Sequence, residues 1–406
     1  RLELLSHRSG KIFSASLIIA DCQTDLALLE LDEVPGDVTL NPVELSDDIS
    51  KNDTVNLLQF DSNRSLQTGT ARVQNISMTM LPNAPYSMLS YELSTDLNVD
   101  GHGIAVLSKG KLAGIVISYN NSARSCTILP ASVLKRFIED ASEPPYKGFA
   151  SAGFIWTPLI DPIKRDYLNV GDNNGGILVL SRIGNTGAEK TLEPNDVILE
   201  WEGHSLDSMG FYDDEKLGRI SVSHLIRTRT PGDTVQVKLV RDKKPISANL
   251  QLTRLNDENM LIPENIEGDI PEYLITGGFV LRELTGDYLR SYGDWDPRLS
   301  YIYHNSRFNP EKEGQRIVLL SYVIPDTINI GYQNFRDGIV DKVNGKPINN
   351  MNDVFKILDQ DGQIWRLSIR SIGTDLVLDR KTLQQANRRL AFTYQIPAMF
   401  YRKPEQ

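Results

Sequence analysis

The chain has 406 residues, a formal net charge of −10 at pH 7, 40% hydrophobic residues and 24% charged residues. A chain of this length usually holds two to four domains, and the composition is that of a globular protein. Lysine and arginine residues are scattered among the acids without a basic stripe, which argues against nucleic acid as the main partner. No run of 18 apolar residues occurs, so the chain shown predicts no transmembrane segment.

The first 141 residues predict a mostly β domain. Helical periodicity appears only at 131–141, where Val133, Leu134 and Phe137 form one apolar stripe. An all-β body closed by a terminal helix is typical of a barrel or a sandwich. The short β-rich runs that make up this body, separated by turn residues, are 11–20, 26–31, 55–60, 68–76, 90–93, 103–107 and 112–118.

Two later regions have a similar organisation. The stretch 142–147 with its paired prolines and the acidic stretch 256–269 predict linkers. The regions that follow them, 148–255 and 273–402, repeat one order of strands and short helix and share a turn-strand pattern. A repeat of this length predicts tandem domains rather than a solenoid.

The cysteines and histidines give no metal signal. Cys22 and Cys126 are the only two cysteines, and they lie too far apart in the sequence for a metal-binding pair. We interpret them as buried thiols, while a disulfide between them stays open. The five histidines lack the HxxxH and HExxH spacings of zinc sites, so we expect no metal and no cofactor.

Three stretches of the first region resemble the HtrA/Deg family of trypsin-like serine proteases. Residues 24–31 (TDLALLEL) are similar to the segment around the triad aspartate, 103–117 to the strand pair after the nucleophile, and 127–141 to the closing helix. Stretches at 148–159, 323–348 and 388–398 resemble the two PDZ domains of the plant-type members. The resemblance covers essentially the whole chain.

The resemblance implies a mostly β fold class. It places a trypsin-like double β-barrel domain, with an incomplete N-terminal barrel, at 1–141. Two PDZ-like domains are expected to follow, at 148–255 and 273–402. The aromatic-rich insertion 288–308 in the last domain is expected to pack against other subunits, as second PDZ domains of this family do.

The expected catalytic triad is degenerate. Such a triad needs a serine, a histidine base and an orienting aspartate. The resemblance places the aspartate at Asp25 and the serine at Gly101 or, shifted by one residue, at His102. Neither of the last two residues carries a hydroxyl, and Val99 stands where a glycine would turn the backbone for the oxyanion donors. We therefore expect degenerate positions at Asp25, Gly101 and His102, no catalytic residues and no enzyme activity.

The PDZ-like regions are the expected binding sites. PDZ domains add an extended peptide to a sheet edge, and backbone N–H groups of a loop receive the terminal carboxylate. As an alternative, each apolar residue of such a groove could belong to the core. The expected residues of the first site are Ser151, Ala152, Gly153 and Phe154 in the loop, Ile155 on the docking strand, and Leu225 and Ile226 on the opposite helix. In the second site the loop is Thr276, Gly277, Gly278 and Phe279.

Three functions fit these patterns. The first is a non-catalytic HtrA-like pseudoprotease that binds other proteins or peptide C-termini as a scaffold in an oligomer or larger assembly, in the periplasm or cell envelope. The second is an active ATP-independent HtrA/Deg protease and chaperone in protein quality control. Its nucleophile would lie elsewhere, and Ser90, Ser94 and Thr95 are the nearby hydroxyls, without flanking glycines. The third is a regulatory subunit of a mixed HtrA oligomer.

Overall fold

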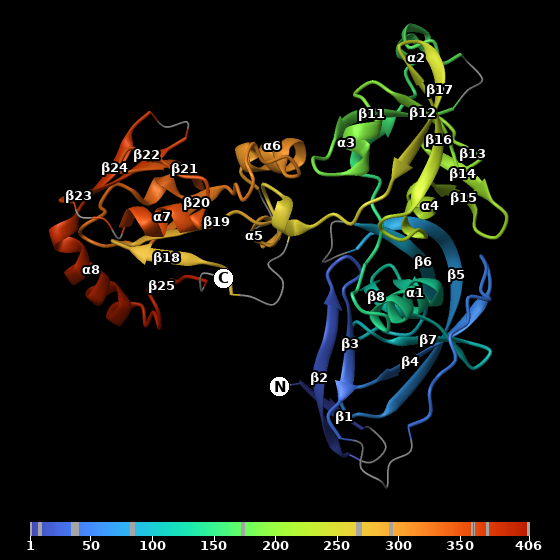
Figure 1. Cartoon of the computed structure of the whole chain (residues 1–406). Helices are drawn as coiled ribbons and strands as arrows, with labels where there is room; N and C mark the ends of the chain where they lie inside the picture. The colour runs from blue at the N-terminus through green and yellow to red at the C-terminus, as the bar shows by residue number, and fades with distance from the viewer. Residues whose placement is uncertain are drawn as a thin grey trace. The chain divides into compact units, whose positions relative to one another are not determined.

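The computed structural model shown in Figure 1 divides into two compact units, Arg1–Leu255 and Asn256–Gln406, and each is described by itself. Parts of the predicted second linker (265–269) and of the predicted aromatic insertion (292–294) lie outside the described residues. The described residues are 2–6, 10–33, 40–81, 86–171, 175–264, 270–291, 295–358, 360, 362–370 and 373–403.

The first unit begins with a three-stranded antiparallel sheet in the order β1-β2-β3. Its strands are β1 (Leu2–Leu5), β2 (Ile12–Asp21) and β3 (Leu26–Leu31). Leu17 and Ile18 on β2 are more than half exposed, so part of the apolar surface of this sheet is uncovered among the described residues.

A closed six-stranded barrel follows, in the order β4-β5-β6-β9-β8-β7. Alternate residues such as Val55 and Leu57 are fully buried, because side chains of a strand point to opposite faces. Helix α1 (Ala131–Ala141) starts directly after Pro130, which confirms the predicted closing helix. The barrel strands are β4 (Thr54–Phe60), β5 (Leu66–Met80), β6 (Ser87–Thr95), β7 (Ala105–Ser108), β8 (Lys111–Asn120) and β9 (Ser125–Pro130).

The region 148–255 forms a second sheet with the order β10-β11-β12-β16-β17, in which β10 is an edge strand. Strand β13 pairs with β12, and β14 and β15 form a separate hairpin. Its strands are β10 (Phe154–Pro158), β11 (Ile177–Arg182), β12 (Val197–Trp201), β13 (His204–Ser205), β14 (Phe211–Asp214), β15 (Gly218–Ser221), β16 (Thr234–Arg241) and β17 (Lys244–Gln251). Its helices are α2 (Pro162–Tyr167), α3 (Gly187–Thr191) and α4 (Ser223–Arg227).

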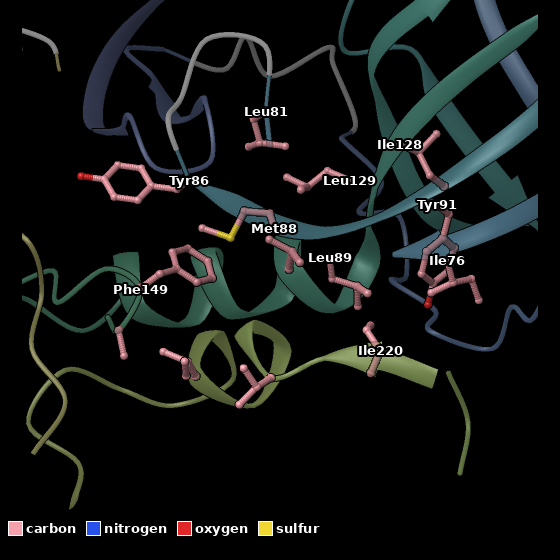
Figure 2. Close-up of a cluster of buried hydrophobic side chains, with 14 of the residues drawn as sticks. Ile76, Leu81, Tyr86, Met88, Leu89, Tyr91, Ile128, Leu129, Phe149 and Ile220 are labelled. Atoms are coloured by element: carbon pink, nitrogen blue, oxygen red, sulfur yellow. The ribbon is translucent and has the colours of Figure 1, made fainter. Parts of the chain in front are cut away.

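The barrel and this second sheet share one hydrophobic core. Figure 2 shows α4 and Ile220 facing Met88 and Leu89 of β6, with Phe149 beside α1. The segment between them, predicted as a linker, is held in place. The Asp140 carboxylate accepts the backbone N–H of Gly148 at 2.6 Å, and the N–H of Phe149 donates to Oε1 of Gln23 at 3.0 Å. The boundary predicted between 1–141 and 148–255 is therefore packed, and the two domain ranges stay a prediction.

The second unit is built on one curved sheet in the order β24-β23-β21-β20-β19-β18-β25, with β22 paired to β21. Its strands are β18 (Tyr273–Thr276), β19 (Phe279–Glu283), β20 (Val318–Val323), β21 (Gly338–Val343), β22 (Lys346–Pro347), β23 (Ile364–Ile369), β24 (Asp375–Asp379) and β25 (Phe400–Tyr401). Its helices are η1 (Asp257–Asn259), α5 (Gly286–Arg290), α6 (Pro297–Ser306), η2 (Gln333–Phe335), α7 (Met351–Leu358) and α8 (Arg380–Thr393).

Helices α5 and α6 carry the described part of the aromatic insertion. Tyr288 and Tyr303 are buried in a cluster of apolar side chains. The Tyr303 hydroxyl donates to the fully buried carboxylate of Glu264 at 2.7 Å, and Nη1 of Arg290 lies 3.0 Å from the same carboxylate. These two aromatic rings therefore stabilise their own domain, whereas Tyr301 is 68% exposed. The mostly β architecture itself confirms the predicted fold class.

Candidate functional site

The protease-like loop runs from the end of β6 at Thr95 to the start of β7 at Ala105. Gly101 has φ 129° and Gly103 has φ 75°, which are backbone conformations that favour glycine. The N–H of Gly103 donates to the carbonyl of Val116 at 2.7 Å, so the loop is fixed onto β8. A strained, glycine-rich turn is thus present at the position that the sequence predicted.

Two backbone donors at the start of this turn, the N–H groups of Val99 and Asp100, are already used. Val99 is buried, its N–H donates to Oδ1 of Asn121 at 3.0 Å, and its carbonyl accepts from Nδ2 of the same residue at 3.0 Å. The N–H of Asp100 donates to Oε1 of Gln59 at 3.2 Å. An oxyanion needs N–H groups that point at it without another acceptor. Asn121 and Gln59 occupy these two donors, and sequence reasoning did not identify either side chain.

His102 lies in the loop before β7, and Asp25 lies in the turn between β2 and β3. His102 is exposed, and its Nδ1 lies 2.8 Å from the carbonyl oxygen of Ile117. Because a carbonyl only accepts, Nδ1 carries the proton of this pair. Asp25 lies exposed in the turn between β2 and β3, with φ 58°. Asp25, Gly101 and His102 carry no hydroxyl nucleophile between them.

The nearby hydroxyls lie on β6 and are bonded to the neighbouring strand. Ser90 is buried, and its Oγ donates to the carbonyl of Ser77 at 3.4 Å. Oγ1 of Thr95 donates to the carbonyl of Thr70 at 2.9 Å, and Ser94 accepts from a glutamine side chain. A serine nucleophile needs an adjacent base. No histidine of the described residues is hydrogen-bonded to any of these three hydroxyls.

The predicted first peptide loop is at the edge of the second sheet. Ser151 exchanges two backbone hydrogen bonds with Thr253, at 2.7 and 3.0 Å. Gly153 has φ 74°, and a Cβ there would overlap the hydroxyl of Thr186, so this position requires glycine. Ala152 and Phe154 are buried.

Strand β10 pairs with β11 on one side, and its other edge has no partner strand among the described residues. Ile155 lies on this edge strand and is half-buried. On α4, Leu225 is half-buried, but Ile226 is 7% exposed and belongs to the core shared with the barrel. The structure therefore brings the loop and Ile155 together, and it supports the core alternative for Ile226.

The predicted second peptide loop is the turn of a hairpin. Thr276 pairs with Phe279, and Gly277 and Gly278 between them have φ 56° and 85°. Two successive positive φ angles are typical of a tight type I′ hairpin turn. Strand β19 therefore pairs with β18 on one side and with β20 on the other, which leaves it no free edge for a peptide. The peptide-binding loop expected at Thr276–Phe279 is thus the tight turn of this hairpin.

Comparison with known proteins extends this picture. Residues 262–400 match the family model described as PDZ domain. The chain is 25% identical over 367 residues to "Putative protease Do-like 3, mitochondrial" of Arabidopsis thaliana, covering 88% of this chain and 63% of that protein. It is 24% identical to "Protease Do-like 4, mitochondrial" of the same plant, covering 88% and 67%. The chain is related to the HtrA/Deg proteases. It spans less than two thirds of the length of Do-like 3.

A solved HtrA structure gives a partial structural likeness. The HtrA-type protease AlgW with a decapeptide superposes with a TM-score of 0.47 and 18% identity, covering 61% of this chain and 73% of AlgW. The PDZ match at 262–400 falls on the predicted second PDZ-like region, while a PDZ domain at 148–255 stays a prediction. None of the helices in the described parts has the length and apolar character that a membrane crossing requires.

Two expectations change here. The prediction of no enzyme activity is wrong by this comparison, because the HtrA/Deg relatives that cover most of the chain are named proteases. The open question of a disulfide is settled, because Cys22 and Cys126 are not bridged; Cys126 is buried as expected, whereas Cys22 is only half-buried. Burial raises the pKa of Cys126 to about 11, which makes this thiol a poor nucleophile.

Proposed function

We propose that this chain is a component of an ATP-independent HtrA/Deg-type protease that acts in protein quality control. The observation that carries the proposal is the similarity to Do-like proteases over 88% of the chain, which includes both the barrel and the PDZ domain. The relatives extend beyond the chain, so the substrates and the activity of the complete assembly belong to the proposal.

Peptide capture is the part of this function that the geometry supports best. The loop Ser151–Phe154 leads directly into β10, whose outer edge has no partner strand among the described residues. An extended peptide can add to such an edge through backbone hydrogen bonds. In the 256–406 unit, β18 already fills the corresponding edge of β19. The proposal therefore assigns peptide capture to 148–255.

A second candidate is a regulatory subunit in a mixed HtrA oligomer. The observation that favours it is the loop at Gly101 and His102, which carry no hydroxyl. The two preceding N–H groups are already bonded to the side chains of Asn121 and Gln59. In such an oligomer, related subunits would supply the nucleophile. The two candidates place the reactive serine on different chains: the first on this chain, the second on a related subunit.

One experiment separates these candidates. The native assembly is purified, its casein hydrolysis is measured, and it is labelled with a fluorophosphonate that reacts with activated serines. The first candidate predicts that the purified chain alone hydrolyses casein and carries the label, at a serine that peptide mapping identifies. The second predicts a label only on copurifying subunits. An assembly that neither hydrolyses casein nor takes the label would contradict both.

The relatives named here also bear on the compartment. Two are named as mitochondrial and another, "Protease Do-like 2, chloroplastic", as chloroplastic. Our proposal therefore extends the predicted periplasmic or cell-envelope location to organelles of this kind. Fractionation of the native cell with an antibody against the chain tests it, and a purely cytosolic signal would contradict it.

A further inference from the structure

Arg227, the last residue of α4, has an unusual environment for a charged side chain. It is half-buried, its Nη1 donates to the carbonyl of Ala150 at 2.8 Å, and its guanidinium lies 5.2 Å from the centre of the Tyr86 ring. Desolvation lowers the pKa of this guanidinium to about 10. No carboxylate of the described residues lies within ion-pair distance of it.

Other arginines of the same unit show the contrast. Arg241 is bound by Asp196 at 2.6 Å, and Arg229, two residues after Arg227, is bound by Glu202 at 2.7 Å. Arg136 lies close by, but both of its Nη atoms donate to backbone carbonyls at the end of α4, those of Arg227 and Arg229. Arg227 therefore retains guanidinium donors and has no ion-pair partner among the described residues, and Asp21 acts on its charge only from beyond ion-pair distance.

Arg227 lies next to the loop that is expected to bind a peptide carboxylate. Ala150, which Arg227 contacts, directly precedes the loop Ser151–Phe154. Two N–H groups of that loop are already bonded: that of Ser151 to Thr253, and that of Gly153 to Oγ of Ser151 at 3.2 Å. A carboxylate that binds at this loop needs a further hydrogen-bond donor. A guanidinium is charged and can donate two parallel hydrogen bonds to one carboxylate.

We propose that Arg227 pairs with the terminal carboxylate of a peptide that adds to β10. This inference rests on the proposed peptide capture by 148–255 and identifies the residue that recognises the peptide end. The Tyr86 ring and the Ala150 carbonyl hold the guanidinium in place before the peptide arrives. A buried charge without a counter-charge is unfavourable, and the incoming carboxylate removes that penalty.

The test compares full-length variants in a binding assay. The probe is a pool of fluorescein-labelled decapeptides with apolar residues at the last three positions, made with a free carboxylate and with a C-terminal amide. We expect the wild type to prefer the carboxylate form by about tenfold, the scale of one charge-assisted hydrogen bond. Arg227→Met should lose this preference and Arg227→Lys should keep part of it. The matched control Arg229→Met should keep it, because Glu202 already pairs with Arg229.

The stability of the peptide-free protein provides a second readout. Removal of an unneutralised charge should raise the Tm, so Arg227→Met is expected to melt above the wild type. A purely structural arginine would give the opposite sign. Equal binding of both peptide forms by the wild type, a carboxylate preference that survives in Arg227→Met, or a lower Tm would each overturn this inference. If neither peptide form binds, the proposed peptide capture itself is wrong.

Discussion

The backbone N–H of Gly277 donates to Oδ1 of Asn387 at 2.7 Å, across 110 residues of sequence. On the other side of the same turn, Nδ2 of Asn329 donates to the carbonyl of Gly277 at 2.7 Å. The loop in which a PDZ domain would receive a peptide carboxylate is thus closed by side chains of its own domain. This relationship is why peptide capture is assigned to the edge of β10.

Asn329 should be one of the most sensitive positions of the 256–406 unit. It is fully buried, and its side chain bonds the carbonyls of Gly277 and Ile324, the N–H of Asp326 and the amide of Gln333. Asn329→Ala leaves these groups without their partner, and we expect a loss of about 2–4 kcal/mol in the free energy of unfolding. Urea denaturation followed by tryptophan fluorescence measures it.

The control for Asn329 is Asn305→Ala. Asn305 is exposed on α6 and makes one side-chain bond, to the carbonyl of Tyr301 at 2.7 Å. We expect a change within about 0.5 kcal/mol for this variant. Equal losses for the two variants would show that the Asn329 hydrogen bonds do not stabilise the hairpin turn.

Gly153 and Gly203 form a matched pair for the peptide loop. Both have positive φ angles, 74° and 84°, so alanine is strained at either position. A Cβ at Gly153 would also overlap Thr186, whereas a Cβ at Gly203 meets nothing within 4 Å. Gly153→Ala should therefore lower the free energy of unfolding by about 1–3 kcal/mol more than Gly203→Ala does. It should also weaken peptide binding. Equal thermal shifts would refute the close contact with Thr186.

Asp21 should make stability fall as the pH rises. Burial raises the pKa of this carboxyl above 3.8, against the opposing effects of the Thr24 hydroxyl at 2.7 Å and of Arg254 at 3.8 Å. The folded state binds the proton more tightly than the unfolded state. The contribution of Asp21 is therefore complete below pH 3.8 and is lost as the pH rises through the folded pKa.

Asp21→Asn removes this titration. The Tm of Asp21→Asn minus that of the wild type should be larger at pH 7.5 than at pH 4. At pH 7.5 only the wild type must bury a charged carboxylate. Differential scanning calorimetry at both pH values measures the difference. A Tm difference that stays constant, or that becomes less favourable at the higher pH, would contradict the burial argument.

Glu264 is expected to hold the α5–α6 region together. Its buried carboxylate bonds the Tyr303 hydroxyl and pairs with Arg290 at 3.0 Å and Arg307 at 3.5 Å. Glu264→Gln leaves the guanidinium of Arg307 without its counter-charge and that of Arg290 paired with Asp287 only, so we expect a loss of about 3–5 kcal/mol in the free energy of unfolding. Near-UV circular dichroism reports the packing of Trp295 on Tyr303, whose ring centres are 5.3 Å apart. Glu311→Gln, at an exposed site, is the control and should leave both signals unchanged.

Local patterns predicted the barrel well, because alternating apolar residues and turn residues act over a few positions. The same kind of signal was present at Gly277-Gly278, two glycines between apolar runs, and it indicates a hairpin. The resemblance to a PDZ loop led us to expect a peptide-binding loop at this point. The contacts that decide the sites, such as Asn387 to Gly277 or Arg227 to Ala150, join residues far apart in the sequence. No local pattern predicts them.

Fluorophosphonate labelling of the native assembly during casein hydrolysis, with the labelled serine mapped to its chain, tests the proposed protease role directly. We expect hydrolysis that the reagent abolishes, with the label on this chain or on a related subunit that copurifies with it. An assembly that contains this chain, leaves casein intact and takes no label would contradict the claim that the chain works in an HtrA/Deg-type protease.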